Sequence, residues 1–182
     1  LNSVFRSDPF FQLNNSSSGS LNYSGLDSYP LVILNELPNI SDGLSQQLQA
    51  YCKRGGNIMV FPDLNNDQSA LKKFLQLLGT DLPLEVLTSA SRVSVINLKH
   101  PIYKGVFENI PQKMDLPIVK KYLRFSSLNN TKRQNLLELP GNVIFLSEYS
   151  FGNGKVYLSA VPLKAESSNF ARHSLFVPIM YQ

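Results

Sequence analysis

Two stretches decide the fold: YPLVILNE at residues 29–36 and GGNIMVFP at residues 55–62. Each contains a continuous run of four apolar residues, which is typical of a strand buried on both faces of a parallel sheet. Between the two runs, Leu44, Leu48 and Tyr51 fall on one face of a helix. A strand, a helix and a strand within about thirty residues predict a βαβ unit with a right-handed crossover.

The residues that flank this helix are suited to begin and end it. Ser41 or Asn39 can accept a hydrogen bond from a free backbone N–H of the first turn. The pair Gly55-Gly56 follows and can adopt the left-handed conformation in which many helices end. A second helix is predicted by the apolar residues at 71–78, ended by Gly79. Its predicted cap is Asp67 or Asn66.

The rest of the chain is predicted to be rich in strands. Segment 84–140 resembles an insertion, with strand-like runs at 84–87, 93–98, 118–125 and 136–139. Near the C-terminus, Asn153-Gly154 stands between apolar runs at 143–146 and 155–161, which predicts a hairpin because both residues tolerate positive φ.

We predict a single domain over residues 1–182, which includes both ends of the chain. Residues 1–25 are polar and predicted to be irregular, whereas residues 169–182 predict a capped helix that Pro178 kinks or restricts to a start near Phe176. The expected fold class is α/β, with a three-layer, mostly parallel sheet, an added β-rich segment and a C-terminal hairpin.

Composition excludes several classes of function. The chain has 182 residues, of which 43% are hydrophobic, and 17 basic against 13 acidic side chains give a formal net charge of +4. The basic residues are scattered rather than clustered, so no nucleic acid partner is expected. One cysteine and two distant histidines predict neither a disulfide nor a metal site, and no cofactor motif is found. No apolar run approaches the roughly 20 residues that span a bilayer.

Several segments, taken in order, resemble the class I glutamine amidotransferase-like fold. Asp27-Ser28-Tyr29 before the first strand matches that fold's "D-x-Y-D-hydrophobic" strand, with Pro30 in the usual place of the second aspartate, and residues 55–58 match its "G-G-x-hydrophobic" strand. HPIYKG at 100–105 resembles the "H-P-I-x-x-G" segment of domains without amidotransferase activity, such as the trehalose-utilisation type. GNGKV at 152–156 is similar to their "G-x-G-K/R-V" hairpin strand. The resemblance implies a flavodoxin-like arrangement of the sheet.

A narrower resemblance adds a cellular context. The segment SNFARHSLFVP at residues 168–178 is similar to one near the end of the soluble region of membrane-anchored, aerotolerance (Bat)-related proteins of Gram-negative bacteria. This resemblance covers about residues 20–182. It implies a periplasmic domain of an inner-membrane protein, with transmembrane helices outside this sequence, and it implies no enzymatic activity.

The residues of an amidotransferase triad are missing from the expected places. Such an enzyme needs a thiolate nucleophile on the turn after the second strand, a histidine base and a glutamate that orients the histidine. Here Pro62-Asp63 follows that strand, and neither His100 nor His173 is followed two residues later by glutamate. Cys52 falls inside the first predicted helix. We therefore expect no catalytic residue and a protein that is not an enzyme.

Ligands of open α/β sheets bind beyond the carboxyl ends of the strands. That rule selects four candidate residues that line a cleft, namely Asn35, Glu36, Asp63 and Glu148. His173 is a fifth candidate, because Arg172-His173 near a predicted helix start could bind an anion or line a cleft.

Three functions remain open from the sequence. The first is a non-catalytic binding or scaffold module, which takes a protein partner or a small ligand. The second is a hydrolase or sugar-processing enzyme without a thiol, in which Glu36, Asp63 and His173 converge within hydrogen-bonding reach. The third is a small-molecule sensor, which would contain a formed pocket with an apolar lining and a few polar anchors.

Overall fold

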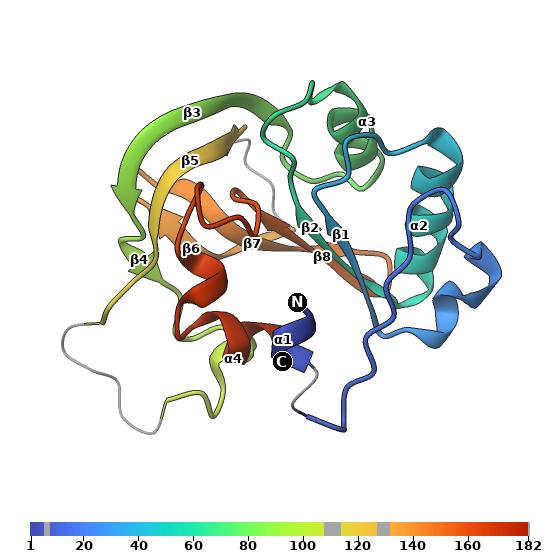
Figure 1. Cartoon of the computed structure of the whole chain (residues 1–182), viewed down its shortest axis with the longest axis horizontal. Helices are drawn as coiled ribbons and strands as arrows, with labels where there is room; N and C mark the ends of the chain where they lie inside the picture. The colour runs from blue at the N-terminus through green and yellow to red at the C-terminus, as the bar shows by residue number, and fades with distance from the viewer. Residues whose placement is uncertain (6–7, 108–113, 127–131, 182) are drawn as a thin grey trace.

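The computed structural model describes residues 1–5, 8–107, 114–126 and 132–181 (Figure 1). Within these residues, six strands form the main sheet in the order β1-β2-β8-β7-β6-β4, and β3 pairs with β5 in a second sheet. The strands are β1 (Leu31–Asn35), β2 (Asn57–Phe61), β3 (Pro83–Arg92), β4 (Val95–Ile96), β5 (Ile118–Phe125), β6 (Arg133–Leu139), β7 (Val143–Phe151) and β8 (Gly154–Ser159). The α-helices are α1 (Asn2–Phe5), α2 (Asp42–Arg54), α3 (Ser69–Leu77) and α4 (Phe176–Tyr181), and the 3-10 helices are η1 (Tyr23–Ser28), η2 (Pro101–Tyr103) and η3 (Phe170–Arg172).

The predicted βαβ unit is confirmed. β1 and β2 lie parallel, with Leu31 opposite Asn57. α2 connects them and begins after Ser41, whose Oγ accepts a hydrogen bond from the N–H of Leu44 at 3.2 Å. The helix ends at Gly55, where φ is 120°, a value that favours glycine because a Cβ would be strained there. The apolar runs and the cap residues therefore form the elements that they predicted.

The parallel part of the main sheet is smaller than predicted. β8 lies parallel to β2, but the pairs β8-β7, β7-β6 and β6-β4 are antiparallel. The connection between β7 and β8 is the two-residue turn Gly152-Asn153, and a turn this short can join only antiparallel strands. The predicted fold class is confirmed as an α/β arrangement with a C-terminal hairpin, and its sheet is mixed.

The β-rich segment 84–140, of which 108–113 and 127–131 lie outside the described residues, divides between the two sheets. β3 is longer than the predicted run at 84–87 and pairs antiparallel with β5, whereas β4 is only a short part of the predicted run at 93–98. β4 and β6 extend the main sheet. The curved β3-β5 ribbon is tied to the end of β8 by Leu123, whose N–H donates to the carbonyl of Ala160 at 2.8 Å.

Of the two outcomes predicted for the helix over 169–182, the structure shows the restricted one, in which the α-helix starts at Phe176. Up to residue 181, the structure contains η3 and α4, separated at His173, where the backbone is extended. His173 Nδ1 accepts a hydrogen bond from the N–H of Leu175 at 3.2 Å, which stabilises the break. Pro178 lies in the first turn of α4, where its missing N–H costs no helical hydrogen bond. The proline therefore permits a short helix after the break rather than a kink within a long one.

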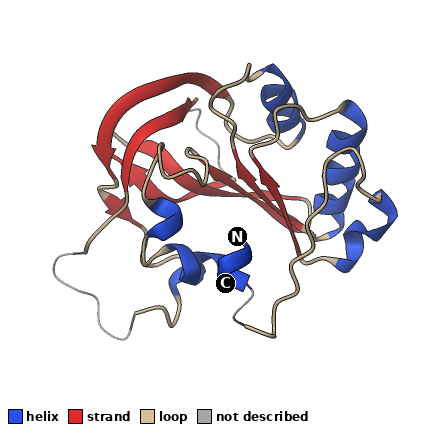
Figure 2. Cartoon of the chain, in the orientation of Figure 1, coloured by secondary structure: helices blue, strands red, loops and turns tan. Residues whose placement is uncertain are grey.

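Helices lie on both faces of the main sheet (Figure 2). α2 and α3 cover one face, toward which Leu34 and Val60 point, and α1 and α4 lie on the other, toward which Leu31, Ile33 and Met59 point. This division follows from the alternation of side chains along a strand. The buried hydrophobic side chains of both faces belong to one continuous core.

Candidate functional site

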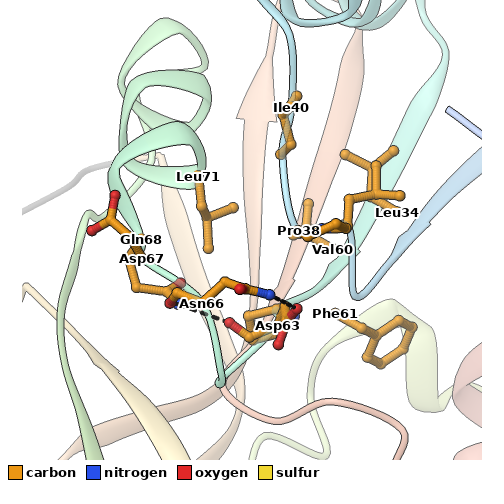
Figure 3. Close-up of a pocket in the computed structure, with 12 residues that line it drawn as sticks. Leu34, Pro38, Ile40, Val60, Phe61, Asp63, Asn66, Asp67, Gln68 and Leu71 are labelled. Carbon is orange, nitrogen blue, oxygen red and sulfur yellow. Dashed lines mark hydrogen bonds between the residues drawn. The ribbon is translucent and has the colours of Figure 1, made fainter. Parts of the chain in front are cut away.

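The carboxyl ends of β1 and β2 form a small cleft, as the fold predicts (Figure 3). Its base is apolar, with Leu34, Ile40 and Leu71, and its rim carries Asp63 and Asn66. The volume is only about 20 Å³, which is close to the minimum that a single water molecule requires, about 10–15 Å³. The cleft as it stands therefore has no room for an organic substrate.

Asp63 occupies the turn that carries the nucleophile in an active amidotransferase. Its Oδ1 accepts a hydrogen bond from the N–H of Asn65 at 2.9 Å, and its Oδ2 accepts one from Asn66 Nδ2 at 2.6 Å. Gln68 Nε2 donates to the Asp63 carbonyl at 2.7 Å. These short-range bonds are typical of an aspartate that fixes a turn. Pro62, just before it, has no N–H to offer an oxyanion.

Glu36 lies beside Asp63 in an unusual backbone conformation. Its φ is 51°, which is uncommon for a residue with a Cβ, and its N–H donates to the carbonyl of Phe61 at 2.9 Å. Its Oε2 lies 2.6 Å from Lys164 Nζ. The hydrogen bond that Lys164 donates to Glu36, together with the negative charge of Glu36, raises the pKa of Lys164, with smaller contributions from Asp63 and Glu166.

The structure therefore brings together two of the five predicted cleft residues, Glu36 and Asp63, around a lysine that the sequence did not single out. Asn35 is exposed at the end of β1, opposite Phe61. No motif marks Lys164, because it reaches the edge from the loop after β8.

Glu148 lies elsewhere than predicted. It is buried in the middle of β7, directly opposite Tyr157 of β8. Its Oε2 is 3.0 Å from Lys155 Nζ and 3.5 Å from His100 Nε2. The register of the hairpin explains this position, because a two-residue turn at Gly152-Asn153 puts Glu148 inside the sheet rather than at its edge. The turn predicted at Asn153-Gly154 would instead place residue 148 opposite Ser159, so the pairing with Tyr157 follows from a turn one residue earlier.

His173 also has partners of its own. Its side chain is buried, and its Nε2 lies 3.6 Å from Asp115 Oδ2 but has no hydrogen-bond partner within the described residues. Burial lowers the pKa of His173, and the charge of Asp115 opposes this effect. The polar contacts of His173 are thus with Asp115 and Leu175. Glu36 and Asp63 have different partners, so His173 does not share a site with them.

Cys52 is fully buried in α2. Its Sγ lies 3.7 Å from the carbonyl oxygen of Phe151 and 3.6 Å from that of Lys155. Burial raises the pKa of the Cys52 thiol to about 11. At neutral pH the sulfur is therefore a thiol, which is a poor nucleophile.

A larger pocket lies on the opposite face of the sheet, near the amino ends of β1 and β2. Its volume is about 250 Å³. The sheet supplies its floor, with Leu31, Ile33, Met59 and Tyr157, and the two ends of the chain supply its other walls, including Phe5, Phe11, Ile179, Met180 and Tyr181. No local pattern of residues marks this pocket, because its walls come from the two ends of the chain.

Two further observations concern the described part of the chain. Nowhere in it do three His, Cys, Asp or Glu side chains gather in a way that could hold a metal ion. Among its helices, none is long and apolar enough to cross a membrane.

Comparison with known proteins identifies the fold. No protein-family model and no curated protein sequence matches the chain. A ThuA-like protein from Bacteroides uniformis has a similar structure, with a TM-score of 0.59 and 19% identity over 87% of this chain and 69% of that one. The chain has a class I glutamine amidotransferase-like fold.

Other solved structures share this fold with less sequence in common. A cytoplasmic protein from Salmonella typhimurium has a TM-score of 0.64 and 11% identity over 88% of this chain and 72% of its own. Gan42B, a GH42 β-galactosidase, has a TM-score of 0.57 and 13% identity over 86% of this chain, but only 21% of the galactosidase is covered. At these identities the likeness concerns the fold alone.

Proposed function

We propose that this chain is a non-catalytic binding module built on the amidotransferase-like fold. The observation that carries the proposal is the turn after β2. There Pro62 and Asp63 stand in place of a nucleophile, and the carboxylate of Asp63 already accepts hydrogen bonds from Asn65 and Asn66. The thiol of Cys52 offers no substitute, because it is buried and its pKa is raised to about 11.

The hydrolase alternative has less support. It needs two carboxylates and an imidazole that converge on a substrate. Glu36 is ion-paired with Lys164, Asp63 fixes its own loop, and the nearest acidic partner of His173 is Asp115. The cleft that Asp63 lines has a volume of only about 20 Å³, and Glu36 does not line it.

The test of the proposal combines an activity assay with labelling of the thiol. We expect no release of ammonia from glutamine above background, and no reaction of Cys52 with an aromatic disulfide reagent until the protein unfolds. Cys52→Ser is expected to fold normally and to give the same result in the activity assay. Rapid labelling of the folded protein, together with an activity that is lost in Cys52→Ser, would contradict the proposal.

We also propose that a membrane-anchored protein presents this module in the periplasm. The resemblance to the Bat-related proteins supports this placement, as does the position of the two chain ends, which lie next to each other (Figure 1). Segments attached to both ends would leave the module from one place. Reporter fusions to the natural full-length protein test the idea: alkaline phosphatase joined to the module should be active and β-galactosidase inactive, and the reverse pattern would overturn the placement.

A further inference from the structure

The pocket beneath the chain ends has the size of a small-molecule site. An engineered apolar cavity of about 150 Å³ binds benzene, which has six non-hydrogen atoms, so by proportion a cavity of about 250 Å³ takes roughly ten. The pocket here measures about 250 Å³. Its floor is formed by half-buried or buried apolar side chains of β1 and β2, namely Leu31, Ile33 and Met59.

Aromatic side chains from both ends of the chain close the pocket. The ring of Tyr181 stacks on Phe5 at 6.0 Å between centroids and lies 4.6 Å from Phe11. The hydroxyl of Tyr181 donates to the carbonyl of Val4 at 2.7 Å. These contacts hold the N-terminal segment against α4, so the apolar walls are already formed in the free protein. A preformed pocket reduces the entropy that a ligand loses on binding.

One polar group of the lining points to the kind of ligand. Tyr157 lines the pocket and lies directly opposite Glu148 in the pairing of β8 with β7. A carboxylate only accepts hydrogen bonds, so a phenol that donates its single hydrogen toward Glu148 keeps a lone pair for a donor on the ligand. The ammonium of Lys155 already donates to Glu148 Oε2 at 3.0 Å, and His100 Nε2 lies 3.5 Å from the same oxygen.

We propose that this pocket binds a small uncharged molecule whose apolar body packs on Leu31, Ile33 and Met59 and whose hydroxyl group donates to Tyr157. The inference rests on the proposed binding function and names the class of ligand: alcohols or phenols of roughly ten non-hydrogen atoms. An anionic head group is disfavoured, because Glu148 is a carboxylate and the adjacent ammonium is already paired.

The test compares three probes of similar size: 1-octanol, octanoate and ethylbenzene. Binding to the isotope-labelled protein is followed by NMR titration. We expect saturable binding of octanol and ethylbenzene, with shifts confined to the pocket, and at least tenfold weaker binding of octanoate. Equal affinity for octanoate and octanol, or the absence of saturable octanol binding, would overturn the inference.

Three variants locate the site. Tyr157→Phe is expected to weaken octanol about two- to tenfold, the range of one hydrogen bond, and to leave ethylbenzene unchanged. Leu31→Trp fills the pocket and should abolish binding of both probes. The control is Leu77→Trp, at an exposed position of α3, which should bind both probes as the natural chain does. If Leu31→Trp fails to fold, Ile33→Trp replaces it. If the variant with the filled pocket still binds octanol, octanol does not bind in this pocket and the inference is wrong.

These outcomes are separate from those of the glutamine assay. A protein that binds none of the probes and releases no ammonia loses this inference but keeps the proposed function. A protein that binds octanol and also hydrolyses glutamine keeps the pocket and loses the claim that it is not an enzyme.

Discussion

Acidic side chains at the carboxyl edge of the sheet have different partners from acidic side chains that are buried in the protein. At the edge, Asp63 accepts hydrogen bonds from residues two and three positions away, and Glu36 pairs with the half-exposed Lys164. In the interior, the side chain of Asp81 is fully buried and its Oδ2 lies 2.6 Å from Arg133 Nη1. Tyr149 also donates to it, at 2.9 Å.

Each interior carboxylate has several partners on other elements of the fold. Asp81, before β3, holds Arg133 of β6 and Tyr149 of β7. Glu148 of β7 holds Lys155 of β8 and lies beside His100, before η2. At the edge, Asp63 bonds within its own turn and Glu36 pairs with one half-exposed lysine. The difference teaches that burial, rather than position at a ligand-binding edge, distinguishes the acids that join several elements.

The largest effect is expected from Asp81→Ala. It leaves Arg133 without its buried partner and the hydroxyl of Tyr149 without its acceptor, so the free energy of unfolding should fall by about 3–5 kcal/mol. Urea denaturation measures the change. The matched change at the edge, Asp63→Ala, removes turn hydrogen bonds in a more accessible place and should cost about 1 kcal/mol. If Asp63→Ala proves the costlier of the two, the contrast between edge and interior is wrong.

A smaller effect is expected from Glu148→Gln. The amide keeps the shape of the side chain but removes the charge that faces Lys155, which should cost about 2 kcal/mol in urea denaturation. The side chain of Lys155 is 44% exposed and can turn to water in this variant. Lys155→Met is the comparison from the other side of the pair. It leaves the buried carboxylate of Glu148 without its cation, so this variant should lose more stability than Glu148→Gln. The opposite order would mean that the buried acid does not depend on the lysine.

Local signals in the sequence predicted the elements and failed where distant segments meet. The βαβ unit follows from apolar runs and the Ser41 cap, and the hairpin lies where predicted, with its turn at Gly152-Asn153, one residue before the predicted Asn153-Gly154 pair. These signals act within a few residues. The pairing of β3 with β5 has no such signal, because their paired residues are joined through a long connection that contains β4 and η2. The break at His173 was missed because it depends on one side-chain contact with Leu175.

The candidate site shows the same limit. Position relative to the strand ends found Glu36 and Asp63, which do lie together around Lys164. This rule could not find Asp81, because its partner Arg133 lies in β6, 52 residues later in the chain. Nor could it find the pocket, since residues 1–25 carry no periodic pattern and gain their role only by packing against α4.

The smallest effect, and the only gain in stability, is expected from Glu36→Gly. At φ 51° the Cβ of Glu36 is unfavourable by about 1 kcal/mol, and glycine removes that cost. The lost ion pair with Lys164 is exposed on one side and contributes little. The free energy of unfolding should therefore stay unchanged or rise by up to about 1 kcal/mol.

Glu36→Ala is the control for this last change, because alanine loses the ion pair and keeps the unfavourable Cβ. It should be less stable than Glu36→Gly in the same urea titration, and Glu36→Asn should lie between them, since asparagine tolerates positive φ better than alanine does. A Glu36→Gly protein less stable than Glu36→Ala would mean that backbone strain is not what distinguishes this position. The edge would then depend on its side-chain contacts as the interior does.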